Sequence, residues 1–354
     1  MSDISGELIE RVVQARQQGQ KLALCGGNSK TFMGREASGE PLAAGSHCGI
    51  VSYQPVELVM TARGGTTVQE ITETLAEQGQ VLACEPPSFN GQATIAGTLA
   101  CNLSGPARPW AGSFRDAVLG VQLINGLGQQ LNFGGQVMKN VAGYDVSRMQ
   151  AGGMGTLGII TQVSFKVMPK PAAQCTLVAP MNAEQAIETM NRLAATPKPL
   201  TGACWLDDKL YLRLAGAASA VAGTVLQWPG QAMDAQQGDN FWSAVKEQQS
   251  LFFASKTALW RFSVRPTAAH FLPEAPWSID WGGGQRWLKG EYDRAELERF
   301  AEASGGQVAL YRGGDRRGEV FHSQPAAVKV LQKRLKAALD PEGIFNPGRL
   351  YSWL

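Results

Sequence analysis

The sequence has almost no excess charge and no long apolar run. Its 354 residues carry 32 Lys and Arg against 30 Asp and Glu, a net charge of +2, so we expect no nucleic-acid partner. No apolar run reaches the roughly 18 residues that span a bilayer, so we expect no membrane span. The N-terminal stretch MSDISGELIERVV lacks the basic start and apolar centre of a signal peptide, which predicts a cytoplasmic chain.

Cysteine and histidine are scarce and scattered. The six cysteines all lie at least seventeen residues apart, which excludes C-x-x-C metal and iron–sulfur patterns. Without an export signal we expect no disulfides. The three histidines, His47, His270 and His322, form no ligand cluster, so we predict no metal. Redox chemistry by this chain would therefore need an organic cofactor.

Glycine, by contrast, is concentrated, most of all in AGGMGTLGII at 151–160. The following run alternates, with Ile159, Thr161, Val163, Phe165 and Val167 on one face, and predicts a strand. The Gly-Lys-Ser/Thr of a Walker loop is absent, and a Rossmann fingerprint needs a strand before its glycines and a helix after them. A glycine loop that enters a strand therefore argues against a nicotinamide site.

The sequence pattern of residues 1–170 predicts short strands that alternate with helices. A long stretch of low charge at 84–120 is expected to be an irregular, functional loop. A capping box of Thr67 and Glu70 predicts the start of one helix, and Asn125-Gly126 or Gly128 predicts the turn of a hairpin. The other expected elements are a helix ending near Gly19, a strand at 21–25, a loop at 26–34, a strand at 57–62, a helix at 68–78 and the hairpin at 118–134.

The composition changes near residue 170, since eight of the nine tryptophans lie beyond residue 200. We interpret 168–175 as a linker and 176–320 as a second domain. Its expected elements are a helix at 182–195, strands near 203–214 and 258–264, a helix near 240–249 and a hairpin or bulge within 279–290. The tail begins with a helix whose apolar face carries Val328, Leu331, Leu335 and Leu339, and which ends at Asp340-Pro341.

Four loops in the first half share small, turn-forming, weakly charged residues: CGGNSK, CEPPSFNGQATIAG, GSFRDAVLG and GGMGTLGII. Together they can offer many backbone N–H groups to a diphosphate. Their order, with NVAGYDVSRMQAGGMGTLGIITQVSFKVMP and a terminal GIFNPGR, resembles the FAD-binding family of vanillyl-alcohol oxidase and p-cresol methylhydroxylase. RPWAGSFRDAVLG, GGQVMKNVAGYDVSRM and DPEGIFNPGR are similar to the narrower family of FAD-binding subunits of bacterial glycolate oxidase complexes.

The resemblance implies an α+β fold. It places a two-subdomain FAD-binding domain of the p-cresol methylhydroxylase type at 1–170, an α+β cap domain at 176–320, and a helix and tail at 321–354 that return to the FAD domain. It also implies the cofactor-binding residues, which are Gly26, Gly27, Asn28, Ser29, Lys30, Pro87, Thr94, Ile95, Ala96, Gly97, Ser113, Arg115, Asp116, Gly155, Thr156, Leu157, Gly158, Ile159, Ile160 and Asn346.

Catalytic residues stay unassigned. Members of this family that oxidise 2-hydroxy acids carry an H-x-H pair near the end of the cap domain, and one histidine acts as a base. The matching region here, YRGGDRRGEVFHSQ at 311–324, has only His322. A carboxylate substrate would need an arginine, and the sequence does not select among Arg108, Arg115, Arg312, Arg316 and Arg317. No histidine lies in the FAD loops, so we expect non-covalent FAD, with His47 left as a formal exception.

The resemblance leaves three interpretations of function. The first is an FAD-binding subunit of a multi-subunit glycolate oxidase, which helps to oxidise glycolate to glyoxylate with an electron acceptor other than a nicotinamide. Its implied partners are a second FAD-containing subunit and an iron–sulfur subunit, and its complex could attach peripherally to the inner face of the cell membrane. The alternatives are a self-sufficient FAD-dependent 2-hydroxy-acid dehydrogenase and a non-catalytic flavin-fold assembly subunit.

Overall fold

The computed structural model describes residues 2–135 and 145–354, and the chain divides into two units. Unit 1 consists of Met1–Leu103, Ser113–Pro169 and Arg316–Leu354, and unit 2 of Ser104–Gly112 and Lys170–Asp315. The short stretch 104–112 therefore groups with unit 2, although it lies inside the segment 1–170 that we assigned to the FAD domain. The stretch 136–144, part of GGQVMKNVAGYDVSRM, lies outside the described residues.

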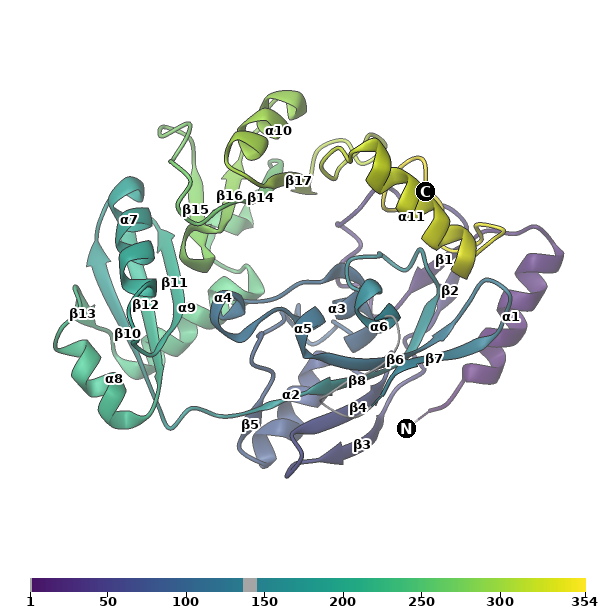
Figure 1. The fold of residues 1–354 in the computed structure, drawn as a ribbon, viewed down its shortest axis with the longest axis horizontal. Coiled ribbons are helices and arrows are strands. Elements are labelled where there is room, and N and C mark those ends of the chain that lie inside the picture. Colours follow the sequence, from purple (N-terminus) through teal and green to yellow (C-terminus); the bar gives the residue numbers. More distant parts are fainter. Residues whose placement is uncertain (1, 136–144) are drawn as a thin grey trace. The chain divides into compact units, whose positions relative to one another are not determined.

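A five-stranded antiparallel sheet forms the centre of unit 1, in the order β3-β4-β8-β6-β7 (Figure 1). The predicted alternation of β8 is confirmed, since Thr161, Val163 and Phe165 are buried while Ser164 and Lys166 are partly exposed. The strands are β3 (Ile50–Gln54), β4 (Val59–Arg63), β6 (Val118–Ile124), β7 (Gln130–Gly134) and β8 (Ile159–Lys166).

Local side-chain hydrogen bonds set the boundaries of several elements around this sheet. Helix α2 (Val68–Glu77) begins where predicted, because Thr67 Oγ1 accepts the N–H of Glu70 at 3.1 Å. The predicted hairpin between β6 and β7 is also confirmed. Its turn is held by Asn125 Oδ1, which accepts two backbone N–H groups at 3.0 and 2.9 Å.

The stretch 84–120 is less irregular than we predicted. It contains three short helices, α3 (Ile95–Cys101), α4 (Arg108–Ala111) and α5 (Phe114–Ala117). Thr94 Oγ1 starts α3 by accepting the N–H of Gly97 at 3.3 Å. The sequence analysis missed these helices because each spans only one or two turns, which is too short to show a hydrophobic period. Helix α6 (Val146–Met149) is equally short.

A second layer of unit 1 joins the two ends of the chain. Helix α1 (Ser5–Gln17) packs through Leu8 and Val12 against β1 (Leu22–Cys25), which pairs in parallel with β2 (Glu40–Ala43). The tail extends this layer, because Phe345 forms a parallel bridge to Leu22 and is fully buried. The tail therefore belongs to the core of unit 1. The small pair β5 (Gln80–Val81) and β9 (Met168–Pro169) completes the unit.

Helix α11 (Ala326–Leu339) forms in the tail as predicted, but its buried face is different. Leu331, which we placed on the apolar face, is 62% exposed, whereas Lys336 is buried beside Leu339. The apolar period predicted the helix correctly. The buried lysine was missed because its partners lie elsewhere in the chain.

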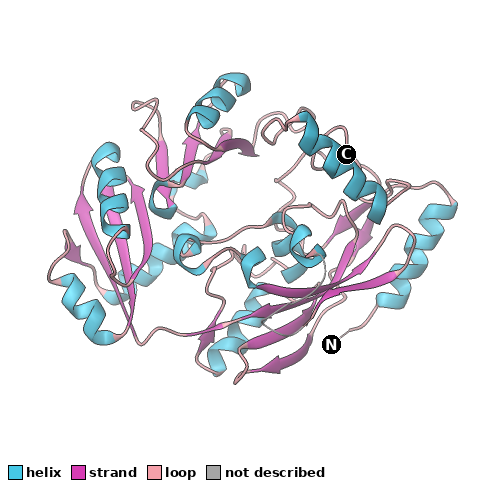
Figure 2. Cartoon of the chain, viewed as in Figure 1, coloured by secondary structure: helices cyan, strands magenta, loops and turns pink. Residues whose placement is uncertain are grey.

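Unit 2 is built on an eight-stranded sheet in the order β13-β10-β12-β11-β15-β16-β14-β17. Figure 2 shows the chain with helices in cyan and strands in magenta. Part of the predicted linker 168–175 is wrong, since β10 begins at Ala173. The hairpin predicted within 279–290 is confirmed as an antiparallel pair joined by a short 3-10 turn, η2 (Trp281–Gly283). The strands are β10 (Ala173–Pro180), β11 (Leu200–Leu206), β12 (Lys209–Gly216), β13 (Gln231–Ala232), β14 (Leu259–Ser263), β15 (Trp277–Asp280), β16 (Gln285–Lys289) and β17 (Gln307–Arg312).

The helices of unit 2 lie close to the predicted positions. Those predicted at 182–195 and near 240–249 correspond to α7 and α9, although α9 begins five residues earlier than expected. The helices are α7 (Ala183–Ala194), α8 (Ala218–Val225), α9 (Ala235–Glu247), α10 (Arg294–Ala303) and the 3-10 turn η1 (Leu251–Ala254). Within the described part of the chain, none of the helices has both the length and the apolar character that crossing a bilayer requires.

Candidate cofactor site

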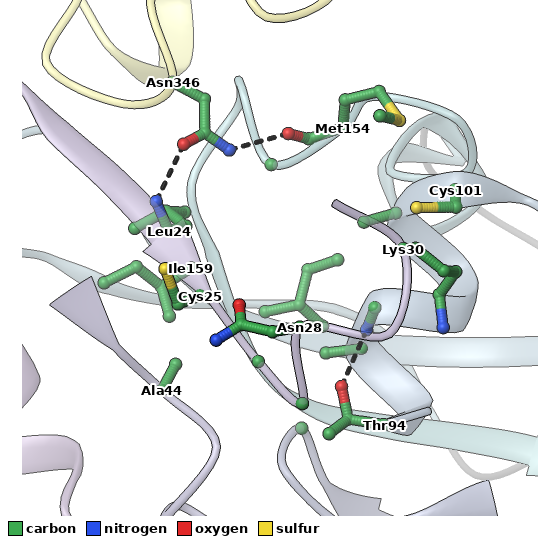
Figure 3. A pocket seen from close by; sticks show the side chains of 18 of the residues that line it. Leu24, Cys25, Asn28, Lys30, Ala44, Thr94, Cys101, Met154, Ile159 and Asn346 are labelled. Atoms are coloured by element: carbon green, nitrogen blue, oxygen red, sulfur yellow. Dashed lines mark hydrogen bonds between the residues drawn. The ribbon is translucent and has the colours of Figure 1, made fainter. Parts of the chain in front are cut away.

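A pocket in unit 1 collects most of the glycine-rich segments that the sequence singled out (Figure 3). Its empty volume, with the open mouth included, is about 870 Å³. The end of β1 and its loop, the start of α3, the glycine loop before β8 and the tail all contribute to its wall. Segments far apart in sequence therefore line one cavity.

The loop after β1 offers backbone N–H groups to this pocket. Asn28 has a left-handed backbone, with φ of +56°, and such a residue in a turn aims successive N–H groups at one concave side. Among the residues that the structure describes, the N–H groups of Gly27, Asn28 and Ser29 donate to no protein acceptor. A diphosphate fits this loop, because unpaired N–H groups in such a nest bind anions.

Two cationic side chains line the same pocket. Lys30 is 8% exposed, and its Nζ donates to Ser29 Oγ at 3.2 Å and lies 5.6 Å from the centre of the Phe89 ring. Arg349 approaches from the tail and donates to Thr31 O at 3.0 Å and to Arg35 O. Burial lowers the pKa of Arg349. Two cations inside one cavity favour an anionic ligand.

The side chain of Asn346 fastens the tail to the rest of the pocket wall. Its Oδ1 accepts the N–H of Leu24 at 2.7 Å, and its Nδ2 donates to Met154 O at 2.7 Å (Figure 3). These two bonds join the end of β1, the glycine loop and the tail. Asn346 itself has a left-handed backbone, with φ of +43°, which asparagine tolerates better than most residues.

The glycines of MGTLG leave room for protein atoms behind the pocket wall. A Cβ at Gly155 would lie 2.7 Å from Asn346 Nδ2, and a Cβ at Gly158 would lie 2.6 Å from Ile124 O. Both residues also have left-handed backbones, with φ of +71° and +147°. Their backbone lines the pocket while their missing side chains make room for protein.

A buried ion pair supports the wall from behind. Lys336 Nζ donates to Thr156 O at 2.6 Å, to Phe345 O at 2.8 Å and to Asp340 Oδ2 at 2.7 Å. Burial lowers the pKa of Lys336, and the hydrogen bond and charge of Asp340 oppose that shift. Helix α11 is thereby fixed to the glycine loop and to the tail.

Most of the predicted cofactor residues line this pocket, and seven do not. Ile95 and Leu157 lie in the hydrophobic core, and Thr156 contributes its carbonyl to Lys336. Ser113 and Asp116 bond to each other at the start of α5. The predicted residues that line the pocket are Gly26, Gly27, Asn28, Ser29, Lys30, Thr94, Ala96, Gly97, Gly155, Gly158, Ile159, Ile160 and Asn346; the others are Pro87, Ile95, Ser113, Arg115, Asp116, Thr156 and Leu157.

Several lining residues were not predicted from the sequence. Gly64 and Gly65 belong to the turn RGGTT at 63–67, and a Cβ at Gly64 would lie 2.2 Å from Ile160 O. Adjacent glycines in that turn were the signal that could have found them. The other unpredicted lining residues are Leu24, Cys25, Thr31, Ala44, Ala100, Cys101, Met154 and Arg349.

None of the three histidines is among the described residues that line the pocket. His47 is 2% exposed, and its Nδ1 accepts the N–H of Ile4 at 3.2 Å, so its ring holds the N-terminus in place. His322 is also buried, and its carbonyl accepts the hydroxyl of Tyr351 at 3.0 Å. His47, which the sequence left as a formal candidate for a covalent bond to FAD, therefore does not line this pocket.

Comparisons with known proteins agree with this geometry. A family model described as an FAD binding domain matches residues 5–134. The fold is similar to that of alkyldihydroxyacetonephosphate synthase, with a TM-score of 0.66, 16% identity, and 97% of this chain and 75% of that chain covered. The chain is thus an FAD-binding protein of α+β fold and of the p-cresol methylhydroxylase type, and its class is that of FAD-dependent oxidoreductases.

Two curated relatives narrow this class. The chain is 41% identical to glycolate oxidase subunit GlcE of Escherichia coli K12, over 99% of both chains. It is 31% identical to glycolate oxidase subunit GlcD of Bacillus subtilis, over 41% of this chain and 31% of that protein. The chain belongs to the GlcE family of glycolate oxidase subunits.

Proposed function

We propose that this chain is the FAD-binding subunit of a multi-subunit glycolate oxidase, which oxidises glycolate to glyoxylate and passes electrons to an acceptor other than a nicotinamide. The observation that carries the proposal is the pocket of unit 1, with its unpaired N–H groups at Gly27, Asn28 and Ser29 and its two cations. Similarity to GlcE over the whole chain supports the same reaction.

Each part of the pocket has a role in holding FAD without a covalent bond. Bound FAD would supply the electron-accepting ring for oxidation of a 2-hydroxy acid. The N–H groups of the loop at 26–30 hold the diphosphate, and Lys30 and Arg349 offset its negative charge. Asn346 holds the tail and the glycine loop together. The predicted residues outside the pocket, such as Thr156 and Leu157, support its wall.

We further propose that the substrate base lies on a partner subunit. Neither the H-x-H pair of catalytic relatives nor a histidine lining the pocket is present in the described residues. Relatedness to GlcE and GlcD supports a second flavin subunit as partner. This sequence has no group of cysteines that could bind an iron–sulfur cluster, so a separate iron–sulfur subunit would carry the electrons onward. That subunit would also bring the complex to the inner face of the membrane.

The test begins with the purified full-length chain. We expect a flavin spectrum, and we expect acid precipitation to release the flavin into the supernatant. Glycolate should bleach that flavin poorly without partners, because loss of a general base costs roughly 10²- to 10⁴-fold in rate. A colourless chain would contradict FAD binding, and yellow colour in the pellet would contradict a non-covalent cofactor.

Turnover of glycolate with an artificial dye distinguishes the remaining alternatives. Robust turnover by the pure chain would favour the self-sufficient dehydrogenase. Recovery of full turnover only after the GlcD-type subunit is added would support the subunit interpretation. An assembly subunit would give the same turnover in the complex whether or not its own flavin site is intact.

A further inference from the structure

Unit 2 contains a tryptophan in an unusual conformation. Trp281 has a left-handed backbone, with φ of +56°, which is rare for a bulky side chain and is often found at functional sites. It is held on both sides, because its N–H donates to Asp280 Oδ1 at 2.7 Å and its Nε1 donates to Gly105 O at 2.9 Å. The second bond fastens the stretch 104–112 to the β15–β16 hairpin.

Two guanidinium groups lie against this one indole. The Cζ of Arg108, at the start of α4, is 4.4 Å from the centre of the Trp281 ring, and the Cζ of Arg261, on β14, is 5.1 Å from it. Arg261 also lies 5.7 Å from the ring centre of Trp287, its neighbour across the sheet. The aromatic rings favour both cations and fix their guanidinium planes.

Arg261 carries its charge without an acidic partner. Among the residues described in this structure it forms no ion pair, and its one hydrogen bond runs from Nε to Gln285 Oε1 at 2.7 Å. Burial, with a smaller contribution from the like charge of Arg108, lowers the pKa of Arg261 to about 10, although Tyr311 and Asp280 oppose the shift. The residue as a whole is partly exposed rather than fully buried.

We infer that Arg108 and Arg261, held by Trp281, form a binding site for the carboxylate of a small organic acid. An anion there would accept the outer N–H groups of Arg261 and relieve the repulsion between the two guanidinium groups. The planar fork of a guanidinium donates two parallel hydrogen bonds to the oxygens of a carboxylate. The choice of a 2-hydroxy acid such as glycolate over a phosphate rests on the proposed function.

The experiment is titration of the FAD-loaded full-length chain with sodium glycolate, without oxygen, followed by indole fluorescence and calorimetry. Glycolamide, the uncharged analogue, and inorganic phosphate are the comparison probes. We expect glycolate to change the fluorescence saturably, glycolamide to have no effect, and phosphate to bind more weakly than glycolate.

Matched variants test whether the glycolate-binding signal comes from Arg108 and Arg261. Arg261→Gln and Arg108→Gln should each weaken glycolate binding roughly 10- to 100-fold, because each removes a charged hydrogen-bond donor. Arg261→Lys keeps the positive charge but loses the planar guanidinium. Its affinity for glycolate should therefore lie between those of Arg261→Gln and the wild type. Arg265→Gln changes an exposed arginine just beyond the same strand, bonded to Ser304 O and Ala303 O, and should bind glycolate as the wild type does.

The flavin spectrum separates this inference from the proposed function. Retained FAD without glycolate binding, or equal binding of glycolate and glycolamide, would overturn the carboxylate site and leave FAD binding intact. Unchanged glycolate binding in a folded Arg261→Gln variant, or binding of phosphate alone, would also overturn it. Should both glutamine variants fail to fold, a wild-type or reduced affinity in Arg261→Lys still decides the question.

Discussion

At the scale of single residues, the cofactor pocket depends on positions where a side chain is missing or a backbone is left-handed. Gly155 and Gly158 combine both features, and Asn28 and Asn346 are left-handed without being glycine. A left-handed residue costs about 1 kcal/mol when it carries a Cβ, and a clash with backbone adds more. Such positions explain why glycine is so concentrated before β8.

A pair of alanine variants separates these two costs. Gly158→Ala should lower the free energy of unfolding by roughly 2–4 kcal/mol and reduce flavin retention, since its Cβ would meet Ile124 O at 2.6 Å. Gly79→Ala is the matched control, because Gly79 is also left-handed, at +62°, but has open space around it. It should cost only about 1 kcal/mol. Equal losses in urea unfolding would contradict the role of the clash.

His47 makes unit 1 sensitive to mild acid. Burial lowers the pKa of His47, and Asp3, 3.6 Å from its Nδ1, opposes this only in part. Below the ordinary value of 6.5 the unfolded chain takes up a proton that the folded chain resists, so stability falls as the pH falls from 6.5 toward the folded pKa. Protonation would also remove the acceptor of the Ile4 N–H.

We therefore expect His47→Asn to flatten the pH dependence of stability. An asparagine oxygen can accept a hydrogen bond in place of Nδ1 and does not titrate in this range. Urea unfolding between pH 7.5 and 5 should show a steeper loss for the wild type than for the variant. Parallel curves for the two proteins would exclude His47 as the cause.

At the scale of elements, α11 shows how a helix with a correctly predicted period can still bury an unexpected side chain. Lys336 is held by Thr156 O, Phe345 O and Asp340, so one ammonium group connects α11, the glycine loop and the tail. Removing one partner of a buried pair leaves the other charge uncompensated, which is more costly than losing an exposed ion pair.

Lys336→Met should lower the free energy of unfolding by roughly 3–5 kcal/mol and loosen FAD binding, because Asp340 would stay buried without its cation. Lys333→Met is the control on the same helix, where Lys333 is exposed near Trp353, and it should change stability by less than about 1 kcal/mol. Thermal melts and flavin retention measure both effects. A mild effect of Lys336→Met would show that the pair does not hold the wall.

At the scale of the whole molecule, the two ends of the chain complete one site. Phe345 pairs with Leu22, and Asn346 bonds Leu24 and Met154, so the tail completes the wall that the first loop begins. Unit 2 takes the stretch 104–112 from the middle of the segment that otherwise builds unit 1. Neither unit is continuous in sequence.

Truncation tests this dependence on the tail. Removal of residues 345–354 should abolish flavin retention, because it deletes the Asn346 clamp and Arg349. Removal of Trp353 and Leu354 alone, which lie outside the residues that line the pocket, should leave flavin content close to that of the wild type. Flavin absorbance of the purified chains measures both. Full flavin content in the longer truncation would contradict the tail's role in the site.

The sequence by itself determined the features that depend on near neighbours. The alternation in β8, the cap at Thr67, the turn at Asn125 and the period of α11 follow from residues two to four positions apart, and all four are present. The ordered glycine loops and the family resemblance also indicated FAD correctly.

Only the tertiary structure decided which distant residues meet. The burial of Lys336, the place of Gly64 and Gly65 in the pocket, the reason for glycine at 158 and the two arginines on Trp281 all depend on partners 20 to 180 positions away along the chain. No local period encodes such pairs, because they are selected by which surfaces pack together once the sheets have formed. The wall of the pocket could thus be predicted as a set of loops, but not as a set of contacts.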